Sequence, residues 1–243
     1  MKTKINFLFT LGLVVILANY VKAQEKTDSA VRAFQLTLVT PLGTNGVESG
    51  NITNKLSINI LAGYNGGLKG TEFGCIANVL KGDMDGAQFA GYANVNLKTG
   101  KGFQGAGFLN YNHKEFRGAQ LSGYANVVLA NSNGFQGAGF ANVVKGNYKG
   151  VQLAGFASVV TDSMDGFQGA GFSNYSRGNT KGQIAGFANF NIGEGKGPQI
   201  SGFGNINTGD FRGVQLSGFS NINTGRTDGV QISGFINYTK VLK

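Results

Sequence analysis

The feature that most constrains this fold is a sixteen-residue unit that recurs from Gly70 to the end of the chain. Copies begin at Gly70, Gly86, Gly102, Gly118, Gly134, Gly150, Gly166, Gly182, Gly197, Gly213 and Gly229. The only irregular copy is the one at Gly182, which lacks the second residue of the unit. A fixed period of this length is typical of repeat proteins, in which each unit packs on its neighbours.

We number the positions of the unit from 1 to 16, starting at its first glycine. Position 3 is Gln in ten copies and Glu72 in the first, and position 9 is Asn except at Ser158. Position 6 is Gly except at Cys75, and position 7 is aromatic except at Ile76. Positions 11 to 16 vary and are rich in Gly, Asn, Asp, Lys and Thr, which are residues typical of turns.

Three rows of equivalent side chains follow from this alignment. The Gln row comprises Gln88, Gln104, Gln120, Gln136, Gln152, Gln168, Gln183, Gln199, Gln215 and Gln231. The Asn row comprises Asn94, Asn110, Asn126, Asn142, Asn174, Asn189, Asn205, Asn221 and Asn237. The aromatic row comprises Tyr92, Phe108, Tyr124, Phe140, Phe156, Phe172, Phe187, Phe203, Phe219 and Phe235.

The unit favours strands over helix. Two or three glycines in every sixteen residues would each cost a helix about 1 kcal/mol relative to Ala. Short runs of β-branched and aromatic residues between turn residues are typical of strands. A single copy offers about four apolar side chains, worth about 1.5–3 kcal/mol each, against a backbone entropy cost of about 1–2 kcal/mol per residue. The copies are therefore expected to stack and share their surfaces.

Two all-β arrangements remain open. In a β-solenoid with one copy per coil, each Gln would lie on the Gln of the next coil, and hydrogen-bonded amide ladders would form. In an antiparallel meander closed into a β-barrel of the outer-membrane type, the same positions would give ten-residue strands with one apolar and one polar face. The regular sixteen-residue period favours the solenoid, because alternate strands of a meander have different environments.

The solenoid hypothesis makes a prediction about the interior. Positions 2, 4, 7, 10 and 15 are expected to surround and fill it, so Phe140→Ala should cost about 3–5 kcal/mol. Positions 2 and 4 also compensate in volume: Phe103 goes with Gly105, whereas Ala119 goes with Leu121. These two positions therefore share one packed face.

The chain before the repeats divides into three segments. Residues 1–23 have a basic start, an apolar stretch from Ile5 to Tyr20, and an A-x-A-like site at Val21 to Ala23, which together predict a secretory signal peptide. Residues 24–32 are polar and are expected to form a flexible leader. Residues 33–69 contain two strand-like stretches and are expected to form N-terminal strands or a cap, followed by an eleven-copy repeat domain over 70–243.

The charge of the chain does not indicate a nucleic-acid partner. The net charge is +9, and it falls to +6 (18 minus 12) when the three Lys of residues 1–23 are removed. The remaining charges are dispersed among turns rather than clustered, as a nucleic-acid site would require. The lone Cys75 excludes an internal disulfide, and its place in a glycine position predicts a small buried residue.

No position of the unit carries a catalytic constellation, so the sequence predicts no enzyme, no cofactor and no metal site. His113 has no partner for a catalytic triad or a metal. Asp83 with Asp85, and Asp162 with Asp165, place paired carboxylates in turns, but most copies have Lys or Arg there. Glycine-rich motifs such as GAGF are not followed by a predicted helix, whose N-terminus a phosphate-binding site needs.

The units GVQLAGFASVV and GVQLSGFSNIN, with the lead-in PLGTNG and KLSINILAGYNGGLKGTEFG, resemble a poorly characterised family of bacterial surface repeat proteins built on G-x-Q-x-x-G-[FY]-x-N units. The resemblance covers residues 33–243. It implies export to the surface of a Gram-negative-type bacterium and no activity. A looser similarity to curli-type repeats lies in the fixed spacing of Gln, Gly and Asn, but the period differs.

From these features we expect an exported, non-enzymatic surface protein that acts as a structural or interaction scaffold, either at the cell surface or outer membrane or secreted. Its partners would be the outer membrane, surface glycans or other surface proteins. Two alternatives stay open: an outer-membrane barrel with a channel or transport role, and a carbohydrate- or surface-binding module that uses the Gln and Asn rows.

Overall fold

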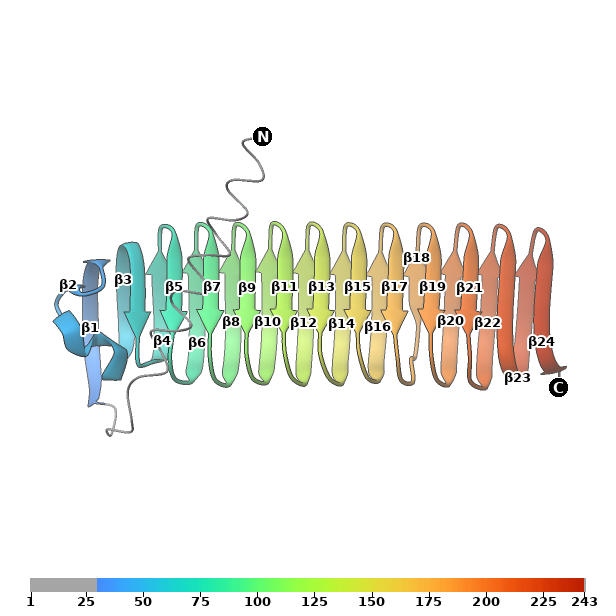
Figure 1. The fold of residues 1–243 in the computed structure, drawn as a ribbon, viewed down its shortest axis with the longest axis horizontal. Helices are drawn as coiled ribbons and strands as arrows, with labels where there is room; N and C mark the ends of the chain where they lie inside the picture. The colour runs from blue at the N-terminus through green and yellow to red at the C-terminus, as the bar shows by residue number, and fades with distance from the viewer. Residues whose placement is uncertain (1–29, 243) are drawn as a thin grey trace.

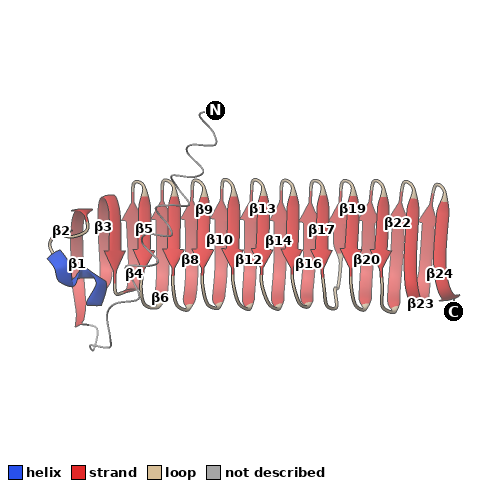
Figure 2. Ribbon diagram, in the orientation of Figure 1, coloured by secondary structure: helices blue, strands red, loops and turns tan. Residues whose placement is uncertain are grey.

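The protein is a β-solenoid of about 12 turns, described here from a computed structural model that covers residues 30–242 (Figure 1). Strands account for 71% of it and helix for 3%, and the helical residues form one short segment near the N-terminal end (Figure 2). The predicted signal peptide, residues 1–23, and residues 24–29 of the predicted leader lie outside the described residues. Within residues 30–242, no helix has the length and apolar character needed to cross a membrane.

Each coil consists of one longer and one shorter strand joined by two turns. The longer strands are β4 (Gly67–Gly74), β6 (Met84–Ala90), β8 (Gly100–Ala106), β10 (Phe116–Ser122), β12 (Ser132–Ala138), β14 (Tyr148–Ala154), β16 (Met164–Ala170), β18 (Gln183–Ala185), β20 (Gly195–Ser201), β22 (Phe211–Ser217) and the second half of β23 (Ser220–Ser233). The shorter strands are β5 (Ala77–Leu80), β7 (Ala93–Asn96), β9 (Leu109–Asn112), β11 (Ala125–Val128), β13 (Ala141–Val144), β15 (Ala157–Val160), β17 (Ser173–Ser176), β19 (Ala188–Asn191), β21 (Gly204–Asn207), the first half of β23, and β24 (Ile236–Leu242).

The coils stack in register, so identical positions of the unit lie next to each other. In the pairing of β10 with β12, for example, Gln120 faces Gln136 and Gly118 faces Gly134. All pairings among the repeats are parallel, and the two strand types form two facing parallel sheets. The β-solenoid prediction is therefore confirmed, and the alternative of an antiparallel meander closed into a barrel is wrong.

The interior is narrow and lies between the two sheets. Positions 3, 9, 11 and 15 point into it, and its apolar core comprises Leu68, Leu80, Met84, Phe116, Val128, Val144, Tyr148, Val160 and Met164 from positions 11 and 15. The expectation that positions 2, 4, 7 and 10 also fill the interior is wrong. Side chains alternate between the faces of a strand, so the inward Gln at position 3 sends positions 2 and 4 outward.

Glycine is required at two positions, one inside the longer strand and one directly after it. At position 1, Gly118 has φ +137, and a Cβ there would lie 1.9 Å from the carbonyl oxygen of Gly102 in the preceding coil. At position 6, a Cβ on Gly123 would lie 2.1 Å from the carbonyl oxygen of Gly107. Neither contact is possible for a real Cβ, so where one regular unit stacks on another, close stacking requires glycine at these two positions.

The shortened copy at Gly182 keeps the register of its neighbours. Its longer strand is reduced to β18, yet Gln183 still pairs with Gln168 on one side and Gln199 on the other. The rings of Phe167 and Pro198 approach Gly182 from the two flanking coils, within 3.3 and 3.7 Å of where its Cβ would be. The neighbouring coils therefore close over the space left by the missing residue.

The N-terminal end has its own structure. It comprises β1 (Ala30–Val39), β2 (Leu42–Gly43), a 3-10 helix η2 (Gly46–Asn51) and β3 (Ile52–Asn65), and β1 pairs with β3 in parallel. Ala30 to Arg32 belong to β1, so the strand begins before the predicted end of the leader. The buried Gln35 Oε1 accepts hydrogen bonds from Asn45, Ser49 and Asn54, which closes this end of the interior with satisfied polar groups.

Candidate interaction surface

The Gln row forms a continuous ladder inside the solenoid. Each Nε2 donates to the Oε1 of the preceding coil, as in the bonds from Gln136 to Gln120 and from Gln152 to Gln136, both 2.7 Å. The members of the row are fully buried except Gln231 in the last coil. Because each amide satisfies its neighbours, burial of the row leaves few unpaired polar groups.

Glu72 begins this ladder, and its carboxylate suits that place. Glu72 Oε2 accepts from Gln88 Nε2 at 2.8 Å, while Oε1 accepts from the amides of Asn59, at 2.9 Å, and Asn65. A Gln here would place its own NH₂ group among donors. Burial raises the pKa of the Glu72 carboxyl above its ordinary value, although the hydrogen bonds from Gln88, Asn59, Asn65 and Ser57 oppose that rise.

The Asn row forms a second buried ladder with the opposite direction. Here each Nδ2 donates to the Oδ1 of the following coil, for example from Asn110 to Asn126 at 2.9 Å, and also to a backbone carbonyl such as that of Leu121. Asn78 begins this row, and Ser158 interrupts it. Except at Gln231 and Asn237 in the last coil, both ladders are buried, so they do not present a row of amides to a carbohydrate or other surface ligand, as one of the alternatives required.

The aromatic row lies outside, at the corner that follows the position 6 glycine. From Tyr92 to Phe235 neighbouring rings are stacked, with centroids 4.6–5.0 Å apart. Phe140 is 39% exposed and Phe219 is 41% exposed, so these rings contact one another but are open on their outer edges. The assignment of Phe140 to the interior is therefore wrong, because the turn at this corner directs the side chain away from the space between the sheets.

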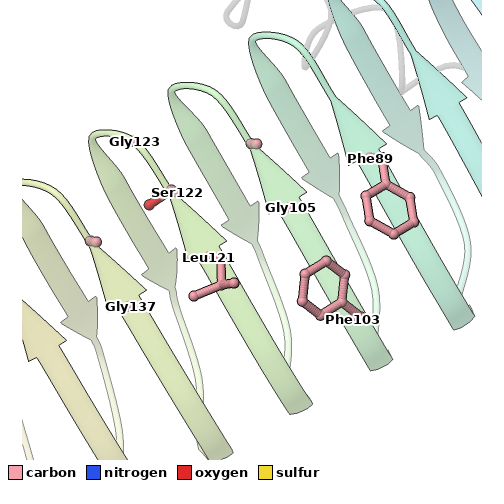
Figure 3. A pocket seen from close by; sticks show the side chains of 9 residues that line it. Phe89, Phe103, Gly105, Leu121, Ser122, Gly123 and Gly137 are labelled. Carbon is pink, nitrogen blue, oxygen red and sulfur yellow. The ribbon is translucent and has the colours of Figure 1, made fainter.

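Positions 2 and 4 form an outward apolar face on the sheet of longer strands. Large side chains on this face cover the space above neighbouring glycines. The Phe103 ring lies 3.1 Å from where a Cβ of Gly105 would be, and Leu121 Cδ2 lies 2.9 Å from where a Cβ of Gly137 would be. A shallow apolar groove runs over Phe89, Phe103, Gly105, Leu121 and Gly137, where the position 4 glycines leave the backbone uncovered (Figure 3).

The sheet of shorter strands has an outward apolar row as well, at position 10. From Tyr111 to Tyr238 its members are half-buried or exposed, and they are Tyr111, Val127, Val143, Val159, Tyr175, Phe190, Ile206, Ile222 and Tyr238. The aromatic row lies at the corner between this row and the face of positions 2 and 4. We call these three surfaces together the apolar side of the solenoid.

The charged residues lie on the opposite edge, which we call the charged edge, at positions 12 to 16. Position 16 contributes one exposed row along the start of the longer strands, consisting of Lys69, Asp85, Lys101, Arg117, Asn133, Lys149, Asp165, Lys181, Lys196, Arg212 and Asp228. Ion pairs join neighbouring coils in this region, as between Arg212 and Asp228 at 3.2 Å and between Arg226 and Asp210 at 3.0 Å. The hydrogen bonds from the backbone and side chain of Arg226 lower the pKa of the Asp210 carboxyl.

The residues considered for metal or acid–base chemistry are dispersed. Residues 30–242 contain no group of three or more His, Cys, Asp or Glu side chains that could hold a metal ion. His113 is exposed and approaches only the Tyr111 hydroxyl, at 3.3 Å. Asp83 accepts a hydrogen bond from the Thr99 backbone N–H. Cys75 is exposed, so the prediction of a buried residue there is wrong.

No family model, curated protein or solved structure matches the chain. Among residues 30–242, the apolar side is an extended surface whose composition departs from that of an ordinary soluble surface. Sequence reasoning does not find it, because the repeat pattern assigns its aromatic residues to the interior. The signal was present in the sequence: in positions 2 to 10 of all eleven units the only charged residue is Glu72.

Proposed function

We propose that the protein is exported and acts at the bacterial cell surface as a non-enzymatic interaction scaffold, with the apolar side as its contact surface. The observation that carries this proposal is the unbroken stack of outward-facing rings from Tyr92 to Phe235, exposed from Tyr124 onward and flanked on both sheets by further apolar rows. Isolated exposed apolar residues are ordinary, whereas a contiguous apolar surface of this extent marks an interaction site.

The frame behind this surface supports a scaffold role. Backbone ladders, two amide ladders and the ring stack hold each coil to the next, so the contact surface is preformed and pays little ordering entropy on binding. Its chemistry repeats from coil to coil, and such a surface suits a partner that is itself extended. Export is supported by the basic start, apolar stretch and A-x-A-like site of residues 1–23.

The proposal is tested in cells that produce the full chain. We expect cleavage after Ala23, accessibility of the protein to an antibody on intact cells, and retention of the protein with the cells. The variant Phe140→Thr/Phe156→Thr/Phe172→Thr removes three adjacent rings, and we expect it to be exported and folded but released into the medium.

A matched control removes three apolar side chains from the charged edge, as Leu97→Thr/Leu129→Thr/Ile192→Thr, and should be retained like the parent. Uncleaved protein held inside the cell would refute export. Equal retention of the parent and the ring variant would refute the role of the apolar side.

A further inference from the structure

We infer that the partner of the apolar side is a phospholipid bilayer with anionic headgroups, in which the solenoid lies with its long axis parallel to the membrane plane and its aromatic row inserted. This inference rests on the proposed function and names the class of its partner. Four features of the described coils point to lipid rather than to another protein.

The first feature is the distribution of charge around the coil. Every Lys, Arg, Asp and His of the repeat units, and every Glu except the buried Glu72, lies at positions 12 to 16. Positions 2 to 10 therefore place no charged group on the outer surface over the whole length of the array. Charge is the main barrier to insertion of a surface in hydrocarbon, and the apolar side has none.

The second feature is that apolar residues occupy three adjacent surfaces. Phe135 and Leu153 lie on the sheet of longer strands, Phe140 lies at the corner, and Phe190 lies on the sheet of shorter strands, and all four are exposed. A second copy or a flat protein partner docked on one sheet would leave the other sheet uncovered. Lipid chains can cover both sheets and the corner between them at once.

The third feature is the hydrogen bonding of the corner that would enter the bilayer. In a typical coil Gly123 N donates to Ala106 O, Tyr124 N donates to Phe108 O, and Ala125 N donates to the same carbonyl, at 3.0–3.1 Å. The same pattern recurs in the coils from Gly91 to Ser220, except that Gly202 N and Gly218 N donate to the position 6 carbonyls of Gly186 and Gly202. An unpaired N–H in hydrocarbon costs several kcal/mol, and the coil-to-coil bonds remove that cost at the leading corner.

The fourth feature is the depth of the apolar side and the chemistry at its border. The rise from position 2 to position 6 is about 13 Å at about 3.3 Å per residue, before the ring at position 7 extends it. One leaflet of hydrocarbon is about 15 Å deep, half of about 30 Å. Position 16, which precedes position 2 by two residues, lies at the level of the headgroups. Its exposed row holds seven Lys or Arg, including Lys101, Arg117 and Lys149, against three Asp. Basic residues in such a place favour anionic lipids.

The test is a flotation assay with two kinds of vesicle. It uses the chain without residues 1–23, which keeps every residue of the solenoid. One kind is phosphatidylcholine alone, and the other is phosphatidylcholine mixed with phosphatidylglycerol. We expect the protein to float with the mixed vesicles and less with the neutral ones. The ring variant described above should bind the mixed vesicles about tenfold more weakly or worse, because three inserted side chains are lost.

Two further variants separate the contributions. Lys101→Gln/Arg117→Gln/Lys149→Gln removes three of the seven basic residues of position 16, so it should weaken the preference for the anionic vesicles and the sensitivity of binding to salt, while it keeps the binding that depends on the rings. The Leu97→Thr/Leu129→Thr/Ile192→Thr control should bind like the parent, and circular dichroism should show that all variants are folded.

Failure of the folded parent to float with either vesicle would overturn the inference. A ring-dependent dimer that stays with the aqueous fraction would also overturn it, in favour of a second copy as the partner. In both cases the proposed function would stand if the ring variant were still released from cells. Loss of export or equal retention of the variants would instead count against the proposed function, whatever the vesicles show.

Discussion

Removal of one amide from the middle of the Gln ladder tests whether the buried ladder holds the coils together. Gln136 donates to Gln120 and accepts from Gln152, each at 2.7 Å, and its side chain is 1% exposed. Gln136→Ala leaves Gln120 Oε1 without its ladder donor and Gln152 Nε2 without its acceptor. An unsatisfied buried polar group costs about 1–3 kcal/mol, so the two together cost about 2–6 kcal/mol.

The control for this variant lies three residues earlier in the same strand. Asn133 at position 16 is exposed, and Asn133→Ala should change the stability by no more than about 0.5 kcal/mol. Gln136→Glu offers a second comparison, because a carboxylate can still accept from Gln152 but cannot donate to Gln120. It should therefore destabilise the protein more at neutral than at acid pH.

The assay is urea unfolding followed by circular dichroism, together with amide hydrogen exchange. Because each coil contacts only its neighbours, the loss should appear as faster exchange in the coils around β12 rather than as uniform weakening. The reasoning would be refuted if Gln136→Ala changed the unfolding midpoint no more than Asn133→Ala, since the ladder would then add nothing beyond the backbone pairing.

Three other perturbations have defined outcomes. Phe140→Ala should lower the free energy of unfolding in urea by about 1–2 kcal/mol, because Phe140 is 39% exposed but its ring stacks on those of Tyr124 and Phe156 at 4.9 Å. A loss of about 4 kcal/mol or more, as expected for a fully buried Phe, would contradict the outward placement. Gly123→Ala should destabilise the array strongly, since its Cβ would lie 2.1 Å from a backbone carbonyl oxygen, whereas Gly105→Ala meets only the side chains of Phe103, at 3.1 Å, and Phe89, at 3.5 Å, and should be tolerated. Equal melting temperatures for the two variants would argue against the need for glycine at position 6. Because the pKa of Glu72 is raised in the folded protein, its contribution to the free energy of unfolding is most favourable below the pKa of the unfolded carboxyl, about 4.3, and declines as the pH rises through the folded pKa. Glu72→Gln should remove this decline. Thermal unfolding at acid and neutral pH measures it, and a pH profile unchanged by the substitution would refute the raised pKa.

The stacking register could be predicted from the sequence, whereas the side of the strand that faces inward could not. A Gln that returns every sixteen residues predicts that Gln120 lies beside Gln136, because only in-register parallel stacking joins equal residues. An amide row can satisfy itself on either face of a sheet, however, so the same pattern fits a row that points in or out. Because Phe is usually buried, the sequence predicts an interior place for Phe140, but the turn after Gly139 directs its side chain outward.

Local exceptions to the pattern were also beyond prediction. Cys75 stands in a position that elsewhere requires glycine, which suggested a tight buried site, but it lies in the first full coil, where β3 rather than a regular unit precedes it. The tolerance of the gap at Gly182 depends on the rings of Phe167 and Pro198 from adjacent coils, and their contact is not apparent before the coils are stacked.

The equivalence of successive coils has a consequence for how the molecule can change in size. Apart from the coils with Ser158 and the shortened copy at Gly182, the internal coils present the same amides, ring and backbone pattern on their two ends, so a regular unit can be duplicated or deleted without creating a mismatched junction. Each event would lengthen or shorten the molecule by one coil spacing, 4.8 Å between stacked rings such as Phe156 and Phe172. The length of the solenoid is therefore set by the number of repeats that the gene encodes, and recombination between similar repeats can change this number while the fold stays the same.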